Sequence, residues 1–128
     1  MIEGQFGEND ELIFEIELMT KNGEVISVDV MLDTGFTAGY LAIDQQDIIA
    51  LGWQKLQSDI RMKTAQGVGR FDIYEGQVII DSREFIVPVH VGKDLPEILI
   101  GVKWLKLMRL SVDYQLGILT LESIDMNR

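Results

Sequence analysis

The sequence has 128 residues, close to the usual size of one domain, and we expect a single domain over residues 1–128. Hydrophobic residues make up 47% and charged residues 25%, a balance typical of a folded globular protein and not of a disordered chain. The 21 acidic residues outnumber the 11 basic ones and give a formal charge of -10, which disfavours nucleic acid and anionic lipid as partners.

Residue types that commonly bind metals or act as nucleophiles are almost absent. The chain has no cysteine, so disulfides, thiol catalysis and cysteine-ligated metals are excluded. The single histidine, His90, excludes sites that need two histidines from one chain. We therefore expect no metal and no cofactor, and we interpret His90 as a strand residue with one side exposed to solvent.

Targeting and membrane-spanning patterns are also missing from the sequence. The first residues lack the basic start and the apolar stretch of a secretory signal. The longest run free of polar residues, Ile48 to Trp53, is far shorter than the roughly 20 residues that span a bilayer. The sequence therefore predicts a cytoplasmic protein that does not enter a membrane.

The first strands are predicted from the alternation of side chains. Leu12 to Leu18 alternates apolar and acidic residues, as a half-buried strand requires. The pair Asn22-Gly23 favours a type I′ turn, because both positions tolerate positive φ. The chain is expected to return antiparallel over Glu24 to Leu32.

The rest of the chain predicts further strands and little helix. Asp44 to Leu51 is expected to form a short helix, with Asp44 as its cap and Gly52 as its end. Strand patterns then continue from Ser58 to Val91, and a helical turn is predicted at Val102 to Leu107. We expect the long strand region to break at Gly67, Gly69, Gly76 and Asp81 to Arg83, and two last strands at Arg109 to Asp113 and Ile118 to Glu122.

One tripeptide, Asp33-Thr34-Gly35, carries candidate chemistry because it directly follows an apolar strand. Alone, such a tripeptide is often a simple turn in which the aspartate accepts backbone amides. The motifs around this tripeptide favour a catalytic role over a simple turn. An apolar strand that ends at Gly101 lies downstream, and a glycine-rich hairpin tip, Ala65 to Arg70, lies between them.

This order of motifs resembles the retropepsin-like aspartic proteases, and their bacterial members in particular, from about Leu12 to Glu122. The resemblance implies an all-β, closed β-barrel of the acid-protease fold, with one or two short helices, forming half of a twofold dimer. Peptide hydrolysis by this route needs two carboxylates that share a proton, one to activate water and one to polarise the carbonyl. Because the chain has one Asp-Thr-Gly, the resemblance implies a homodimer in which Asp33 of each subunit meets on the axis.

The resemblance also implies roles for neighbouring residues. Thr34 would brace the two loops across the axis, and Gly35 would let the backbone approach the carboxylate. Gly101 would let its strand pack closely against the catalytic loop. A mobile flap would close over a peptide or protein substrate. The expected flap residues are Gln66, Gly67, Val68 and Gly69, and the expected substrate contacts are Phe36, Thr37 and Ile100.

Some features depart from the pattern or fit a second hypothesis. Phe36 stands where many relatives have Ala or Ser, so that position offers no hydroxyl, and Ala38 lengthens the loop by one residue. A plain hairpin tip explains Gly67 and Gly69 as well as a flap does. The alternative is a non-catalytic dimeric module that uses the same groove to bind a peptide or protein.

Overall fold

The computed structural model describes residues 1–64 and 67–124, which form mainly β-strands. Two short helices interrupt the strands, the α-helix α1 and the 3₁₀ helix η1. In chain order the elements are β1 (Ile2–Glu3), β2 (Gln5–Phe6), β3 (Leu12–Met19), β4 (Val25–Leu32), β5 (Leu41–Asp44), α1 (Gln45–Leu51), β6 (Gln54–Thr64), β7 (Gly67–Ile80), β8 (Arg83–Gly92), β9 (Leu99–Ile100), η1 (Val102–Lys106), β10 (Met108–Asp113) and β11 (Ile118–Ser123).

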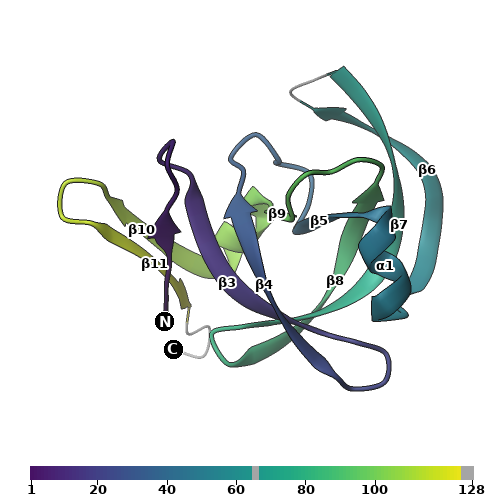
Figure 1. Cartoon of the computed structure of the whole chain (residues 1–128), viewed down its shortest axis with the longest axis horizontal. Coiled ribbons are helices and arrows are strands. Elements are labelled where there is room, and N and C mark those ends of the chain that lie inside the picture. Colours follow the sequence, from purple (N-terminus) through teal and green to yellow (C-terminus); the bar gives the residue numbers. More distant parts are fainter. Residues whose placement is uncertain (65–66, 125–128) are drawn as a thin grey trace.

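The main sheet curls into a barrel-like ring (Figure 1). Its eight strands follow the order β2-β3-β4-β9-β5-β8-β7-β6, and β3 also pairs with β7. This last pairing joins the ring through two register pairs, Glu17 with Ile79 and Leu18 with Val78. The expected all-β fold is confirmed, but the ring is barrel-like rather than evenly closed, because its closing seam is so short.

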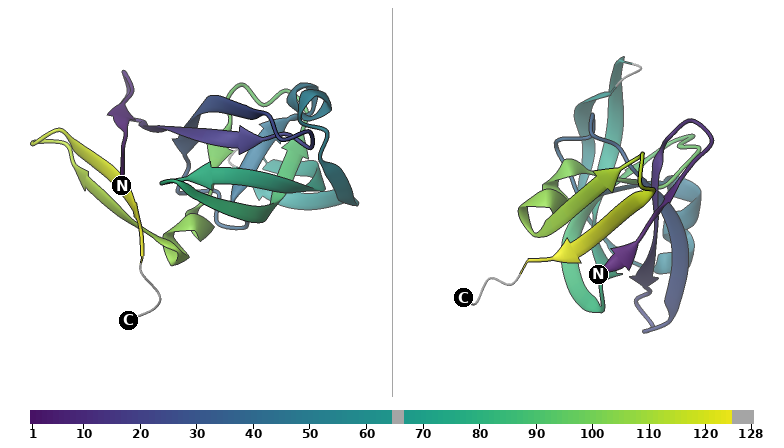
Figure 2. Two further views of the ribbon diagram at one scale, coloured as in Figure 1. Left: turned by 90° about the horizontal axis from the view of Figure 1, so that it is seen from below. Right: turned by 90° about the vertical axis from the view of Figure 1, so that its left-hand side faces the viewer.

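A second sheet carries the β10–β11 hairpin and projects from the ring (Figures 1 and 2). Its strand order is β1-β11-β10, so the first residues of the chain pair with β11. Leu119 and Leu121 of β11 are buried in the same apolar cluster as the ring. Tyr114 at the hairpin turn packs against Phe6, with ring centroids 4.6 Å apart.

Local sequence signals produce the predicted hairpin and helix. Gly23 has φ of 86°, but Asn22 does not have positive φ, so the turn between β3 and β4 is not of the predicted type I′. The Gly23 amide instead donates to the Thr20 carbonyl at 3.0 Å, which closes a turn around Lys21 and Asn22. The Asp44 carboxylate accepts the Gln46 amide at the start of α1, and Gly52 ends the helix with φ of 67°. The amides of Gln46 and Leu95 hold the pKa of Asp44 below its ordinary value. Among the described residues, no helix is long and apolar enough to cross a membrane.

The expected breaks at Gly69 and Gly76 are wrong, because β7 runs without interruption from Gly67 to Ile80. A Cβ added to Gly76 would lie 2.4 Å from Cγ2 of Val89 and 3.0 Å from the Trp53 ring. The glycine therefore admits close packing inside the sheet and does not mark a turn.

Trp104 of η1 lies at the centre of the core, with none of its surface exposed. Its indole Nε1 donates a hydrogen bond of 2.8 Å to the Tyr40 carbonyl. Its ring meets those of Tyr40 and Phe85 edge-on, each at a centroid distance of 5.1 Å. The helix η1 is thereby fixed against Tyr40, in the segment that follows β4.

Replacing Trp104 with Phe should destabilise the protein, since it leaves the Tyr40 carbonyl without a donor inside the core. A buried polar group that loses its partner costs about 1 to 3 kcal/mol, and the smaller ring adds a cavity cost. Chemical denaturation at fixed protein concentration measures the change. Trp53→Phe is the control, because it removes a similar bond to the carbonyl of half-buried Met19. Equal losses for the two variants would contradict the central role of Trp104.

Candidate active site

Asp33 is the first residue after β4, where strand β9 fixes its backbone. The Asp33 amide donates to the Ile100 carbonyl at 3.0 Å, continuing the parallel pairing of β4 with β9. On its other edge β9 pairs antiparallel with β5, with Leu41 opposite Ile100. Strand β9 therefore lies between the two ends of the 33–40 loop and holds both.

The loop itself begins with a tight turn around the Asp33 carboxylate. Oδ1 accepts the Gly35 amide at 2.9 Å, and the Phe36 amide donates to the Asp33 carbonyl at 3.0 Å. Asp33 is half-buried, while Thr34 and Gly35 are exposed. No donor from the described residues bonds Oδ2 of Asp33 or the Thr34 hydroxyl, so both groups remain available to another molecule.

Gly101 lies directly behind this loop and makes very close backbone contacts. Its amide donates to the Tyr40 carbonyl at 2.9 Å, and the next amide, of Val102, donates to the Phe36 carbonyl at 2.9 Å. A Cβ at position 101 would lie 2.0 Å from the Gly39 carbonyl oxygen. Only a glycine can occupy this position without displacing the loop.

The predicted flap residues lie at the end of the β6–β7 hairpin, apart from Gln66, which lies outside the described residues. Gly67 begins β7 with φ of 113°, Val68 is 70% exposed, and Gly69 pairs with Met62. The hairpin projects at the same end of the molecule as the loop after β4 (Figures 1 and 2). The β6–β7 hairpin and the loop that begins with Asp33, directly after β4, therefore lie on one side of the ring.

A small network of charges stabilises the base of this hairpin, where β6 bulges between Gln57 and Ile60. Arg70 donates to both carboxylate oxygens of Asp59 at 2.8 Å. Asp72 accepts the Asp59 amide at 2.9 Å and pairs with Lys55 at 3.2 Å. The Asp59 amide and Lys55 lower the pKa of Asp72, and Asp72 raises the pKa of Lys55.

The three expected substrate contacts differ in exposure. Thr37 is exposed, but Phe36 is buried and packs edge-on against His90. Ile100 is 1% exposed, because its side chain belongs to the central strand of the ring and joins the core. Burial corrects the expectation for Ile100, whose side chain does not reach the surface on which a peptide would lie.

His90 is the residue at the site that the sequence interpretation placed wrongly. It is buried, with 8% of its surface exposed, and it lies in β8 between β5 and β7. Burial lowers the pKa of His90, and the positive charge of Lys103 lowers it further. The sequence feature that indicates this burial is the run of valines around His90, since strands buried on both faces are almost continuously apolar.

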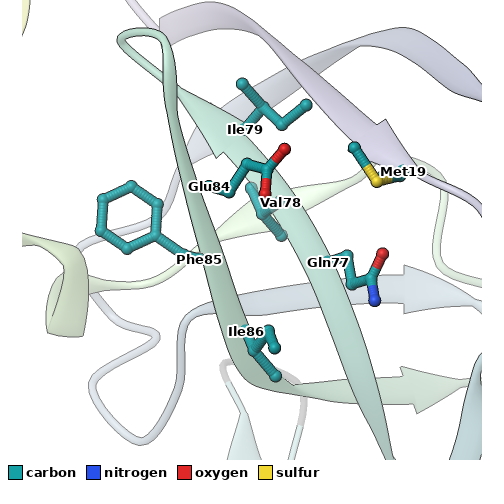
Figure 3. A pocket seen from close by; sticks show the side chains of 7 residues that line it. All are labelled: Met19, Gln77, Val78, Ile79, Glu84, Phe85 and Ile86. Carbon is teal, nitrogen blue, oxygen red and sulfur yellow. The ribbon is translucent and has the colours of Figure 1, made fainter. Parts of the chain in front are cut away.

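Other hollows and clusters offer less chemistry. A hollow of about 180 Å³ lies against β7 and β8, near the turn that joins them, and Asp33 is not among the residues that line it (Figures 1 and 3). Its lining is largely apolar, with Glu84 as its charged residue. Within the described ranges, no group of three or more histidine, aspartate or glutamate side chains is placed to hold a metal ion.

Comparison with known proteins identifies this architecture. No protein-family model and no curated protein matches the chain. A retropepsin-like aspartic protease from Rickettsia conorii aligns with 96% of this chain and 89% of its own, with a TM-score of 0.61 and 21% sequence identity. The EIAV protease, solved with an inhibitor, aligns with 72% of this chain and 84% of its own, with a TM-score of 0.55 and 16% identity.

The chain has the retropepsin-like fold. The fold expected from the order of motifs is therefore confirmed. Within this retropepsin-like fold, the structure brings Asp33, Thr34 and Gly35 together on one loop and backs that loop with Gly101.

In this retropepsin-like fold, Gly101→Ala should be much more destabilising than Gly35→Ala. The added methyl at 101 meets backbone 2.0 Å away, whereas the methyl at 35 meets the Asp33 carboxylate at 3.2 Å and no other described residue within 4 Å. Overpacking costs typically about 1 to 3 kcal/mol, and we expect the upper end or more at 101. Thermal or chemical unfolding compares the two variants. Similar stabilities would show that the strand and the loop are less tightly packed than described.

Proposed function

We propose that this protein is an aspartic endopeptidase that acts as a homodimer, with a water molecule activated between the two Asp33 carboxylates. The observation that carries the proposal is a half-buried carboxylate at a strand end, on a loop fixed from behind by β9 and Gly101. The likeness of the whole fold to two aspartic proteases supports it.

The proposed chemistry follows from two carboxylates held close together. Two like charges at such a distance do not both ionise, so the pair carries one proton and titrates as a unit. The ionised Asp33 takes a proton from water, whose oxygen adds to the peptide carbonyl carbon, while the protonated Asp33 donates to the carbonyl oxygen. Collapse of this intermediate returns a proton to the leaving amine and breaks the C–N bond.

Neighbouring groups support the arrangement within each subunit. The Gly35 amide holds Oδ1 of Asp33, which leaves Oδ2 to face the water and the second carboxylate. The exposed Thr34 is free to bond the partner loop across the axis. Thr37, exposed on the same loop, remains the proposed substrate contact there.

The β6–β7 hairpin has the two-sided character that a flap over a peptide needs. Met62 lies opposite Gly69, and Ile60 lies opposite Phe71, so one face of the hairpin is apolar and partly buried. The opposite face carries the exposed Arg61 and its cross-strand neighbour Arg70. An apolar underside excludes water when the hairpin closes over a bound peptide.

Two features of the β10–β11 hairpin support the proposal that the partner is a second copy of this chain. Val112, Leu116 and Ile118 are exposed by 39%, 72% and 42% on a hairpin that projects from the ring (Figure 2). The outer edge of β10 pairs with no strand in the part of the chain that the structure describes. Exposed apolar side chains beside an open strand edge are typical of an interface.

Asp33→Asn should abolish peptide cleavage while the protein stays folded, because the amide keeps the shape of the carboxyl but does not act as a base. We expect a loss of at least about a hundred- to ten-thousandfold, the usual contribution of acid–base catalysis. A mixed peptide library, assayed at acidic and neutral pH with wild type and variant, measures it. Cleavage that survives the substitution would overturn the proposal. Peptide binding without cleavage by either protein would identify the non-catalytic dimeric binding module instead.

Leu116→Ser should weaken the dimer, because each copy loses an apolar side chain at the proposed interface. A buried leucine contributes about 1.5 to 3 kcal/mol, so we expect the dimer Kd to rise at least about tenfold. Sedimentation velocity over a concentration series measures the Kd. Ile86→Ser, at an equally exposed position on β8, should leave it unchanged. The opposite ranking would move the interface to the β8 face.

A further inference from the structure

His90 is a buried titratable side chain that the proposed chemistry does not use. It lies in β8 opposite Ala42 of β5 and Ile73 of β7, and 8% of its surface is exposed. Its Nδ1 is buried and has no hydrogen-bond partner among the described residues. Buried polar atoms are nearly always paired, so an unpaired imidazole nitrogen beside a candidate active site calls for an explanation.

The His90 ring contacts both parts of the site. It meets Phe36 edge-on, with centroids 5.3 Å apart and planes at 90°, and it meets Phe71 at 6.0 Å and 74°. Phe36 belongs to the Asp33 loop, where its amide bonds the Asp33 carbonyl. Phe71 belongs to β7, the second strand of the flap hairpin. One side chain therefore lies between the catalytic loop and the strand that carries the flap.

The ring also lies directly against the backbone of the loop. A Cβ at Gly39 would lie 2.7 Å from Cε1 and 2.8 Å from Nδ1 of His90. The same Gly39 presents its carbonyl oxygen to Gly101 on another side. Gly39 is thus packed between His90 and Gly101, so a movement of the imidazole would displace the loop.

Protonation would place a charge and a new N–H donor in this apolar contact. Phe71 and Ile73 of β7 share the face of His90 and are apolar, and Ala42 faces it from β5. Lys103 of η1 repels a second positive charge there. A charged histidine in such surroundings loses solvation and gains no partner.

Neither nearby carboxylate is placed to compensate. Asp44, on the His90 face of β5, has its oxygens bonded to the amides of Gln46 and Leu95. Asp33, in the loop itself, bonds the Gly35 amide, and neither aspartate is bonded to His90 in the described structure. Neutral His90 is therefore the form that fits the packed site.

We propose that neutral His90 is the positioning residue that holds the Asp33 loop against the flap-bearing strand, and that its protonation releases the loop and lowers activity in acid. The activity part of this inference rests on the proposed protease function, but the release of the loop does not.

The pKa of the buried histidine lies below the ordinary value of 6.5. Because the unfolded chain then binds the proton more readily than the folded chain, the contribution of neutral His90 to the folding stability is complete above pH 6.5. It is lost as the pH falls below 6.5.

The single histidine makes the titration directly observable, because all imidazole signals in the NMR spectrum belong to His90. We expect it to titrate below 6.5 in Asp33→Asn protein, and the Phe36 and Gly39 amide signals to shift with the same midpoint. This arm requires no cleavage, so it stands even if the protease proposal fails. A midpoint at or above 6.5, or loop amides that do not follow it, would overturn the inference.

Two lysines of η1 offer a matched pair of variants. Lys103→Gln should move the His90 midpoint upward, because it removes the repelling charge, whereas Lys106→Gln, at an exposed position on the same helix, should not. Equal shifts would show that the response is a general effect of net charge.

The activity arm compares the pH profile of kcat/KM in wild type, His90→Leu and His90→Gln. Both variants remove the titration, one with an apolar side chain and one with a polar side chain, so one remains informative if the other fails to fold. We expect the acid limb of the profile to move to lower pH in either variant, and kcat/KM at neutral pH to fall as well, because the imidazole no longer packs against the loop. An acid limb that stays in place would assign the loss of activity in acid to other groups.

Discussion

The contact between Gly101 and the Gly39 carbonyl is the constraint on which the site depends. Without a side chain at 101, β9 passes close enough to the 33–40 loop for the amides of Gly101 and Val102 to bond its carbonyls. The position of Ile100 then fixes the Asp33 amide, and Trp104 follows one helical turn later to bond Tyr40. The orientation of the carboxylate is thus a consequence of how one strand packs behind it.

Most of the bonds that hold this loop join backbone groups. The main-chain amides of Asp33, Phe36 and Gly101 donate to the carbonyls of Ile100, Asp33 and Tyr40, respectively. Backbone bonds of this kind do not depend on side-chain identity, apart from the glycine that permits the approach. This explains how the chain shares its fold with proteases at 21% and 16% identity. What these proteins share is the course of the backbone, and few specific residue types are needed to maintain it.

The sequence predicts those features that local chemistry determines. The β3–β4 hairpin and the Asp44 cap each involve residues within a few positions of each other, and both occur as expected, although the turn that contains Asn22 and Gly23 is not of type I′. Gly76 was misinterpreted because its reason to be glycine, the crowding by Val89 and Trp53, comes from distant segments. His90 was misplaced for the same reason, since Phe36 and Phe71 approach it from two other parts of the chain. Tertiary contacts determine the surroundings of Gly76 and His90, and the pattern of neighbouring residues in the sequence does not reveal those contacts.

The parallel pairing of β4 with β9 has a consequence for biosynthesis. Asp33 is synthesised before Ile100, but its amide bonds the Ile100 carbonyl, and the intervening strands must be ordered before the two meet. Pairings between such distant segments form slowly, because closing a long loop costs entropy before any contact compensates. A nascent chain that has not yet released β9 from the ribosome carries the Asp-Thr-Gly sequence without its geometry. The order of synthesis therefore keeps the Asp33 loop from reaching its final geometry until β9 has emerged.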